Sequence, residues 1–184
     1  MNNVEPWKRI SPTKVDKISY RTIVTKTFIM PNGDTTSFGT FWPEGQEFVS
    51  TIALTKDRHV IVARMFRTGP QRIMNELPGG YVDEGENIDR AGARELREET
   101  GYVPTVIEYL GKTYKDAYAN AVWHFILATD CYLDPDLTHV PEIEEHIETR
   151  LITIDELIEN AKTGKMTDPA GVLIALERLK ELNV

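Results

Sequence analysis

The chain has 184 residues, of which 41% are hydrophobic, and a formal net charge of −8 at pH 7. This length and apolar fraction fit one main domain with a sizeable core and a small appended element, while the negative charge argues against a nucleic-acid backbone as the main partner. Cys131 is the single cysteine, which excludes an internal disulfide and a cysteine-rich zinc site, and no apolar run approaches the roughly 20 residues of a membrane span.

The N-terminal section predicts a small β-rich extension. Tyr20 to Met30 is rich in Thr, Ile, Val and Phe, which favours a strand. Pro31-Asn32-Gly33-Asp34 predicts a turn, after which Thr35 to Trp42 can return as the second arm of a hairpin. Pro43-Glu44-Gly45 then interrupts the pattern. The expected domains are therefore a β-rich extension and a main domain, residues 1–46 and 47–184.

The main domain alternates predicted strands with loops. A loop is expected over Pro70 to Asn75, and an acidic, proline-bearing loop over Leu133 to Glu145. The strands are predicted from β-branched and aromatic runs: Phe48–Thr55, His59–Phe66, Val103–Thr113, Val122–Cys131 and the short Arg150–Ile154.

Three helices complete the predicted architecture. Ile88 to Glu99 has apolar positions on one side and charge on the other, and Gly101 ends it. Thr153-Ile154-Asp155-Glu156 is a capping box that opens a second helix. Asp168-Pro169 opens a third, with Val172, Leu176 and Leu179 as its buried stripe. Helices and strands interleave in this order, which predicts an α/β (α+β) sandwich of helices around a mixed sheet.

Acidic residues are concentrated around the first predicted helix. Between Asp83 and Glu99 the chain has seven carboxylates and three arginines, directly behind the Gly79-Gly80 turn. Glu95, Glu98 and Glu99 stand at i, i+3 and i+4, which places them on one helical face. One interpretation is a solvated helix face laced with arginines. The other is a site for Mg²⁺ or Mn²⁺, since these ions prefer hard oxygen ligands and glycines let backbone approach a ligand closely.

The same residues resemble a known sequence motif, the Nudix box. Gly80, Glu86 and the run Arg94-Glu95-Leu96-Arg97-Glu98-Glu99-Thr100-Gly101 match it position by position, with Tyr102 where an aliphatic residue is usual. Three further segments resemble the ADP-ribose pyrophosphatase branch of the Nudix hydrolases: Met65–Arg67, Glu76–Gly80 and Lys162–Asp168. The resemblance implies a Nudix-like α/β/α sandwich with an N-terminal β-rich extension that supports a homodimer.

The resemblance also implies roles for individual residues. The expected metal ligands are three carboxylates and a carbonyl: Glu95, Glu98, Glu99 and Gly79. Arg94 is expected to hold the carboxylates in register, Glu86 to brace the loop, Gly80 to permit the turn and Gly101 to end the helix. A late glutamate serves as general base in many relatives, and we expect Glu145 in this role, with Glu144 as second choice. The alternative for this run is an ordinary acidic loop.

Three residues are expected at the substrate. Arg67 and Glu76 resemble positions that contact the phosphate and ribose portions, although Arg67 also fits a plain surface arginine. Trp42 is a candidate for stacking on a base, and the alternative is a core or interface tryptophan. Ala117 stands where the ADP-ribose branch has a proline. A nucleotide sugar or another nucleoside diphosphate derivative is therefore as compatible as ADP-ribose.

The sequence thus predicts a Mg²⁺-dependent hydrolase that cleaves the diphosphate bond of a nucleoside diphosphate-linked small molecule. The alternative is a non-catalytic nucleotide-sensing or regulatory module on the same scaffold. The intact set of Glu95, Glu98 and Glu99 favours the enzyme, because a sensor has no need of activated water. Met1 to Arg9 lacks the apolar stretch of a secretory signal. We therefore expect a cytoplasmic protein, with neither nucleic acid nor membrane as partner.

Overall fold

The computed structural model describes residues 4–136 and 146–183. The chain divides into two compact units. The N-terminal unit consists of the first 46 residues and an inserted segment, Tyr114–Val122, and the main unit consists of Glu47–Thr113 and Trp123–Val184. Backbone hydrogen bonds hold the inserted segment to the N-terminal unit, where Phe41 N donates to Tyr118 O at 2.8 Å and Asn120 N donates to Phe41 O at 2.9 Å.

The N-terminal unit contains a three-stranded antiparallel sheet in the order β1-β2-β3. The predicted hairpin is present, and its turn closes with Gly33 N donating to Met30 O at 2.9 Å. The sequence analysis missed the first strand, which contains Pro12. That residue lies within a register shift between Ile10 and Lys14 on an edge strand, where proline is tolerated. The strands are β1 (Lys8–Ile18), β2 (Arg21–Ile29) and β3 (Thr35–Phe41).

The main unit is built on an eight-stranded sheet. Its central order is β11-β5-β4-β10-β8, while β6 pairs with β5, β7 with β4 and β9 with β10. The strands are β4 (Glu47–Thr55), β5 (Val60–Arg67), β6 (Arg72–Glu76), β7 (Gly79–Tyr81), β8 (Tyr102–Val103), β9 (Val106–Tyr114), β10 (Val122–Leu133) and β11 (Glu148–Ile152).

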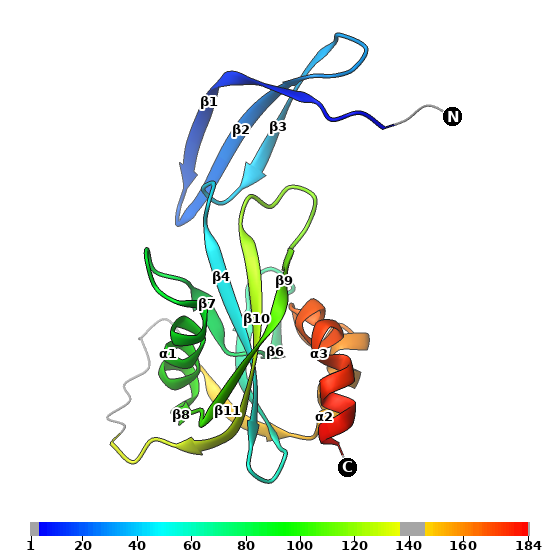
Figure 1. Ribbon diagram of the computed structural model, residues 1–184. Helices are drawn as coiled ribbons and strands as arrows, with labels where there is room; N and C mark the ends of the chain where they lie inside the picture. Colours follow the sequence, from blue (N-terminus) through cyan, green and yellow to red (C-terminus); the bar gives the residue numbers. More distant parts are fainter. Residues whose placement is uncertain (1–3, 137–145, 184) are drawn as a thin grey trace. The chain divides into compact units, whose positions relative to one another are not determined.

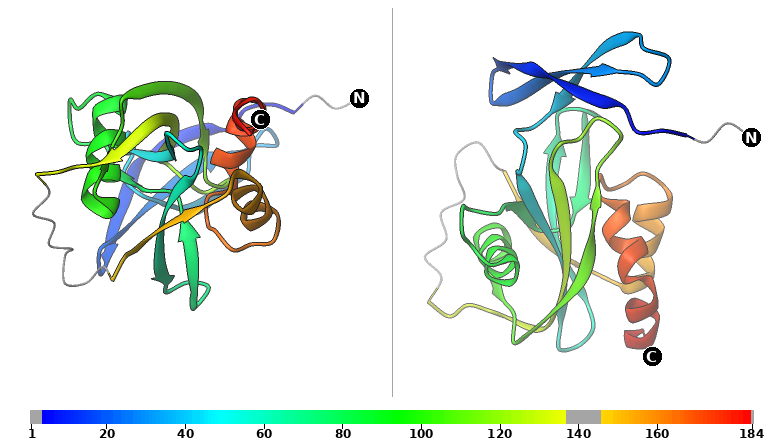
Figure 2. Two further views of the ribbon diagram at one scale, coloured as in Figure 1. Left: turned by 90° about the horizontal axis from the view of Figure 1, so that it is seen from below. Right: turned by 45° about the horizontal axis from the view of Figure 1, so that its top comes forward.

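The helices of the main unit lie on both faces of this sheet. Figures 1 and 2 show α1 (Ile88–Thr100) on one face and α2 (Ile154–Lys162) with α3 (Pro169–Leu182) on the other. This arrangement confirms the predicted sandwich of helices around a sheet. Within the described ranges, no helix combines the length and apolar character needed to span a membrane.

Burial is concentrated in the central strands β4 and β10. In β4 every residue from Phe48 to Leu54 is buried, because helices cover both faces of the sheet there. Tyr102, the one departure from the motif, packs against a core cluster that includes Leu96 of α1 and Cys131 of β10. The unusual residue therefore packs beneath the helix.

Two predicted segments were wrong in part. The loop expected over Pro70–Asn75 is a tight turn followed by β6, which pairs along β5 from Arg67↔Arg72 to Ala63↔Glu76. This strand escaped prediction because Met74 and Glu76 are its only buried residues. The single strand expected over Val103–Thr113 is instead β8 and β9, which are separated at Pro104, a residue that cannot donate to a strand ladder.

The predicted helix ends are found at the expected residues. The side chain of Thr153 accepts a hydrogen bond from Glu156 N at 3.0 Å and caps α2. Gly101 has φ of 78° and ends α1 in the left-handed conformation, with its N–H donating to Arg97 O. In α3 the buried stripe is Gly171, Val172, Ala175 and Leu179, so the expected Leu176 is replaced by the smaller Ala175 against the sheet.

Candidate active site

Helix α1 is fixed closely against the sheet. A methyl group at Gly92 would lie 2.3 Å from Ile126 Cδ1, so only glycine permits this approach. Thr51 Oγ1 of β4 donates to Gly92 O at 3.2 Å, which ties the helix backbone to the sheet. At its start, Asn87 Oδ1 accepts from Asp89 N at 2.8 Å. The helix therefore has little freedom to slide, and its outer face is held in a defined place.

The Gly79-Gly80 segment meets two glutamates of this helix. Gly79 N donates to Glu99 Oε2 at 3.1 Å. A Cβ atom on Gly80 would lie 2.5–2.6 Å from the carboxyl atoms of Glu95. Pairing with β4 fixes both glycines, since Gly79 is opposite Ser50 and Gly80 opposite Val49. The absence of side chains at 79 and 80 thus gives two carboxylates direct access to backbone.

Arg94 connects the remaining acidic residues. Its Nη1 donates to Glu95 Oε1 at 2.7 Å and to Glu98 Oε2 at 3.1 Å. Its Nε and Nη2 donate to the two carboxylate oxygens of Glu86 at 3.2 and 2.9 Å, a bidentate pair. Nη2 also donates to Tyr81 O at 2.9 Å. One guanidinium therefore joins β7, the loop before α1 and the outer face of α1.

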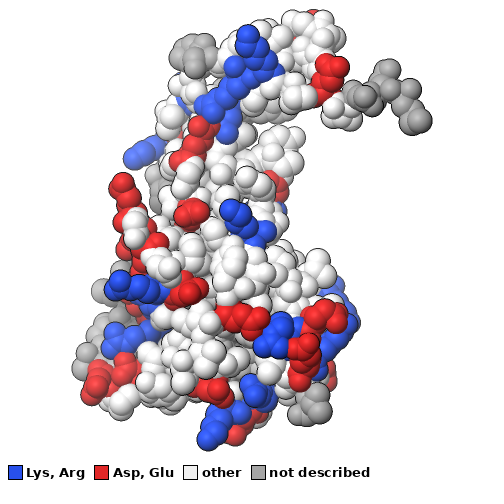
Figure 3. All heavy atoms as spheres, in the orientation of Figure 1, with Lys and Arg blue, Asp and Glu red and all other residues white. Residues whose placement is uncertain are grey.

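These contacts determine the electrostatics of the cluster. Hydrogen bonding from Arg94 holds the pKa of Glu86 below its ordinary value, and the same pairing raises the pKa of Arg94. Figure 3 shows acidic and basic side chains mixed on the side of the main unit where α1 lies. Glu86 and Arg94 therefore form a stable ion pair at 2.9 Å beside the other carboxylates.

The donor chemistry of this cluster fits a divalent cation. Glu95, Glu98 and Glu99 supply carboxylate oxygens and Gly79 supplies a carbonyl, and all are hard ligands that suit Mg²⁺ or Mn²⁺. In the described part of the chain, no three His, Cys, Asp or Glu side chains are placed to share one ion. Instead, Arg94 supplies the positive charge that joins two of these carboxylates. The chemical nature of these ligands therefore fits a divalent cation. The Glu95 carboxyl group occupies the space that a side chain at position 80 would fill.

Glu76 and Arg67 form a second group. Glu76 is fully buried, and its carboxylate accepts from Thr167 N at 3.1 Å and Thr167 Oγ1 at 2.8 Å. Arg67 Nε lies 3.5 Å from Glu76 Oε1. Thr167 belongs to the connection between α2 and α3, which runs beside β6, where Asn75 N donates to Lys165 O at 3.1 Å. The structure thus directs Glu76 to this connection, with Arg67 beside it and half exposed.

Trp42 belongs to the N-terminal unit. Its backbone N donates to Thr22 O at 3.0 Å, and its φ of 66° turns the chain at the end of β3. The ring lies edge-on to Phe41 at 6.0 Å between centroids, and Arg21 Cζ is 5.8 Å from the Trp42 centroid. Ala117 lies in the inserted segment of the same unit. Glu145 and Glu144, expected as general base, lie outside the described residues.

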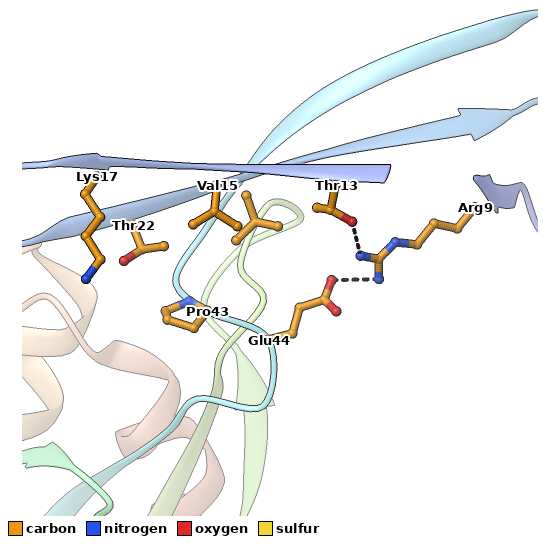
Figure 4. A pocket seen from close by; sticks show the side chains of 8 residues that line it. Arg9, Thr13, Val15, Lys17, Thr22, Pro43 and Glu44 are labelled. Atoms are coloured by element: carbon orange, nitrogen blue, oxygen red, sulfur yellow. Dashed lines mark hydrogen bonds and ion pairs between the residues drawn. The ribbon is translucent and has the colours of Figure 1, made fainter. Parts of the chain in front are cut away.

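The N-terminal unit also contains a cavity of about 390 Å³. Figure 4 shows Lys17 and Thr22 at one end, Arg9 at the other, and Val15 and Pro43 between them. Arg9 Nη1 and Lys26 Nζ bind Glu44 Oε1 at 2.7 and 2.9 Å, and these cations lower the pKa of Glu44. Sequence analysis did not single out this cavity, because its lining comes from three segments that share no motif.

Sequence analysis also missed Tyr81 and Thr167, which contact the predicted residues. Tyr81 follows the glycine pair directly, and its carbonyl accepts from Arg94. Thr167 binds the buried Glu76. The position of Tyr81 beside the motif was an available signal. Thr167 lies within the Lys162–Asp168 segment of the resemblance, but spacing alone does not predict its contact with a residue 91 positions earlier.

Comparisons with known proteins agree with this geometry. The model of the NUDIX domain matches residues 46–173. The ADP-ribose pyrophosphatase of Bacillus subtilis is 25% identical over 121 residues, which cover 65% of each chain. The methanol dehydrogenase activator of Bacillus methanolicus is 25% identical over 145 residues, 78% of this chain and 77% of the relative. The crystal structure of an ADP compounds hydrolase superimposes over 100% of both chains with a TM-score of 0.81 at 18% identity, a likeness of fold.

Proposed function

This chain belongs to the NUDIX domain family, and from that premise we propose that it is a metal-dependent pyrophosphohydrolase. Its substrate would be a nucleoside diphosphate derivative, either ADP-ribose or a nucleotide sugar, cleaved to a nucleoside monophosphate and a phosphorylated moiety. The observation that carries this proposal is the contact of Glu95 and Glu99 with the Gly79-Gly80 backbone. It gathers hard oxygen donors from a helix and a strand at one place.

The metal in this proposal is Mg²⁺, for which Mn²⁺ is a chemical substitute. Glu95, Glu98 and Glu99 would hold it together with the Gly79 carbonyl. When bound, such an ion neutralises diphosphate oxygens and lowers the pKa of a water molecule. Arg94 keeps Glu95 and Glu98 oriented through its 2.7 and 3.1 Å contacts. Among the acidic partners of Arg94, Glu98 is the most exposed, which leaves its carboxylate accessible to an incoming ion.

Arg67 would contact the phosphate portion of the substrate, and Glu76 would act beside it. The guanidinium is half exposed, while its Nε faces the buried Glu76 carboxylate. A guanidinium can donate to an anion in a bidentate way. The general base would be Glu145, with Glu144 as the alternative, and Trp42 would contact the base or an interface.

The relative named ADP-ribose pyrophosphatase supports ADP-ribose as substrate. Ala117 stands in place of the proline typical of that branch, so a nucleotide sugar is an equally compatible substrate. We also propose a cytoplasmic homodimer, formed through the N-terminal unit. The relative named as an enzyme activator favours one second candidate, a regulatory module that binds nucleotides without turnover.

The test is incubation of the full chain with Mg²⁺ and a panel of ADP-ribose and nucleotide sugars, followed by mass identification of products. We expect a nucleoside monophosphate to appear, and chelation of the metal to abolish it. Glu98→Gln and Glu99→Gln should each lower kcat about 100-fold or more while leaving the melting temperature nearly unchanged. Glu84→Gln, the same change on an exposed residue of the preceding loop, is the matched control.

Two outcomes would contradict the assignment. Full activity in the Glu98 and Glu99 variants would remove these residues from the site. Binding of nucleotides without turnover of any panel member would favour the regulatory module instead.

A further inference from the structure

A buried histidine of the main unit lies between two polar side chains. His124 of β10 is 6% exposed, although every other residue from Val122 to Ala128 is hydrophobic. Its Nε2 lies 3.1 Å from Glu47 Oε1, and its Nδ1 lies 3.0 Å from the hydroxyl of Tyr109. Glu47 is the first residue of β4 and Tyr109 belongs to β9, so three strands contribute to this group. None of the three residues belongs to the sequence motif.

The positions of the protons follow from the chemistry of the three side chains. An ionised carboxylate can only accept hydrogen bonds, so the histidine proton lies on Nε2 and is donated to Glu47. The other ring nitrogen of His124 then accepts from the Tyr109 hydroxyl. Burial and the charge of Glu47 raise the pKa of Tyr109, which keeps the phenol protonated at neutral pH. The Glu47 side chain is therefore anchored to the core through the imidazole.

The polar group lies beside the core cluster beneath α1. That cluster includes Ala91 of the helix and Val82, which follows β7. Each of the three polar residues is two positions along its strand from a residue of the cluster or packed against it, and such residues share a face: Val49 in β4, Ile107 in β9 and Ile126 in β10. The group is therefore on the face of the sheet that α1 covers.

One peptide unit links Glu47 to the arginine of the candidate site. The Val82 N–H donates to Glu47 O at 3.1 Å. The carbonyl of Tyr81, which belongs to the same peptide, accepts from Arg94 Nη2 at 2.9 Å. Because a peptide is planar, a tilt of this unit alters both hydrogen bonds together. Arg94 in turn contacts two of the proposed metal ligands. The backbone of Glu47 thus holds the peptide to which Arg94 is bound.

This link lies at the end of a strand, where hydrogen bonds open most readily. The pairing of β4 with β7 ends at Phe48↔Tyr81, and the bond from Val82 N to Glu47 O is the next one beyond it. β10 is the neighbour of β4 in the sheet. The contact of the buried His124 with the Glu47 side chain therefore restrains the end of β4 that would otherwise open.

We propose that His124 is a positioning residue of the candidate active site. By anchoring the Glu47 side chain, it fixes the peptide to which Arg94 is bound. Tyr109 supports this arrangement by fixing the tautomer of the imidazole. As far as activity is concerned, the inference rests on the proposed function, and it adds residues that act on the site without touching substrate. It follows that loss of the imidazole loosens Arg94 and the carboxylates that it orients.

The first experiment measures kcat for ADP-ribose and the affinity for Mn²⁺, the latter by electron paramagnetic resonance. His124→Leu should fold, because it keeps the position apolar and leaves Tyr109 and Glu47, both about half exposed, within reach of water. It should lower kcat about 10-fold and weaken Mn²⁺ binding about 10-fold, with KM little changed. Glu108→Ala is the matched control, since Glu108 precedes Tyr109 in β9 but binds Arg178 of α3.

Two variants of Glu47 test whether the contact itself is responsible. Glu47→Ala should reproduce the losses of His124→Leu, and the double variant should lose no more than about 10-fold, because both changes remove one contact. Glu47→Gln still accepts from the imidazole and should keep wild-type values. Additive losses in the double variant, or equal losses in Glu47→Gln and Glu47→Ala, would overturn the proposal.

A second measurement does not depend on hydrolysis or on a bound metal. In the metal-free chain, NMR records the Nε–H signal of Arg94 and the hydrogen exchange of the Val82 amide. We expect His124→Leu to shift the Arg94 signal and to speed Val82 exchange about 10-fold, because the end of β4 opens more often. If the wild type hydrolyses no substrate of the panel, the proposed function fails, while these two signals still decide the role of His124. Wild-type signals in His124→Leu would refute it.

Discussion

Gly79 and Gly80 are adjacent in the chain, but an added methyl group would meet different obstacles at each. At Gly80 it would meet the carboxyl group of Glu95, the far end of a flexible side chain that can rotate away. At Gly79 it would lie 2.2 Å from Val49 O, which is backbone within the central sheet and cannot move. Substitution of Gly80 therefore tests the geometry of the site, whereas substitution of Gly79 tests the stability of the fold.

We expect Gly80→Ala to lower kcat about 100-fold with a nearly unchanged melting temperature, since displacing Glu95 would misplace a proposed metal ligand by about 1 Å. Gly79→Ala should lower the free energy of unfolding by about 3 kcal/mol, because the sheet must open to admit the methyl group. Steady-state kinetics and urea unfolding measure the two effects. A Gly80→Ala variant with wild-type kcat would show that Glu95 is not required where it lies.

At the level of single residues, sequence spacing predicted local neighbours well. The i, i+3 and i+4 positions brought Glu95 and Glu98 to the same guanidinium, and Arg94 follows from the same periodicity. The full environment of Glu76 could not be predicted, because Thr167, which binds its carboxylate, lies 91 positions away. Burial of a carboxylate depends on such partners, and spacing carries no information about them.

Among the elements, those with strong end signals were predicted best. Thr153 caps the start of α2 and Gly101 ends α1. Both interactions lie within one helical turn, so they can be predicted from the local sequence. Strand β6 has no comparable signal, because its pairing with β5 depends on a tight turn and its residues are mostly exposed. A short edge strand is stabilised by its partner rather than by its own composition.

The two capped helices allow a test of which helix serves the site. Asn87→Ala removes the acceptor for Asp89 N at the start of α1, and Thr153→Ala removes the acceptor for Glu156 N at the start of α2. Each should lower the free energy of unfolding by about 1 kcal/mol. Only Asn87→Ala should also lower kcat several-fold, since Asn87 follows Glu86, which Arg94 holds. Equal kcat values in the two variants would separate the α1 cap from the site.

On the scale of the whole molecule, the division into units exceeds what the sequence predicted. The inserted segment Tyr114–Val122 lies between β9 and β10 in sequence, yet it bonds to Phe41 and Trp42 of the N-terminal unit. No local pattern marks such an exchange, because the segment's hydrogen bonds are made to residues about 75 positions earlier. The assignment of residues 1–46 and 47–184 as domains stays a prediction.

The N-terminal unit presents apolar side chains that a second copy of the chain would cover. Ile18 is 63% exposed and Tyr20 is 74% exposed, at the turn between β1 and β2, and Val15 and Phe41 are exposed as well. Exposed apolar side chains at the turn of a small sheet fit an interaction surface. We therefore expect light scattering to give twice the 20.9 kDa mass of the chain.

The double substitution Ile18→Lys with Tyr20→Lys should weaken the dimer at least about 10-fold and shift the mass toward that of a single chain, because it places charge in the buried centre of the interface. Tyr132→Lys, at a half-exposed tyrosine of the main unit, should leave the mass unchanged. A wild-type mass of 20.9 kDa over a wide range of protein concentrations would contradict the dimer. If the double variant stays dimeric, the interface lies on another surface of the chain.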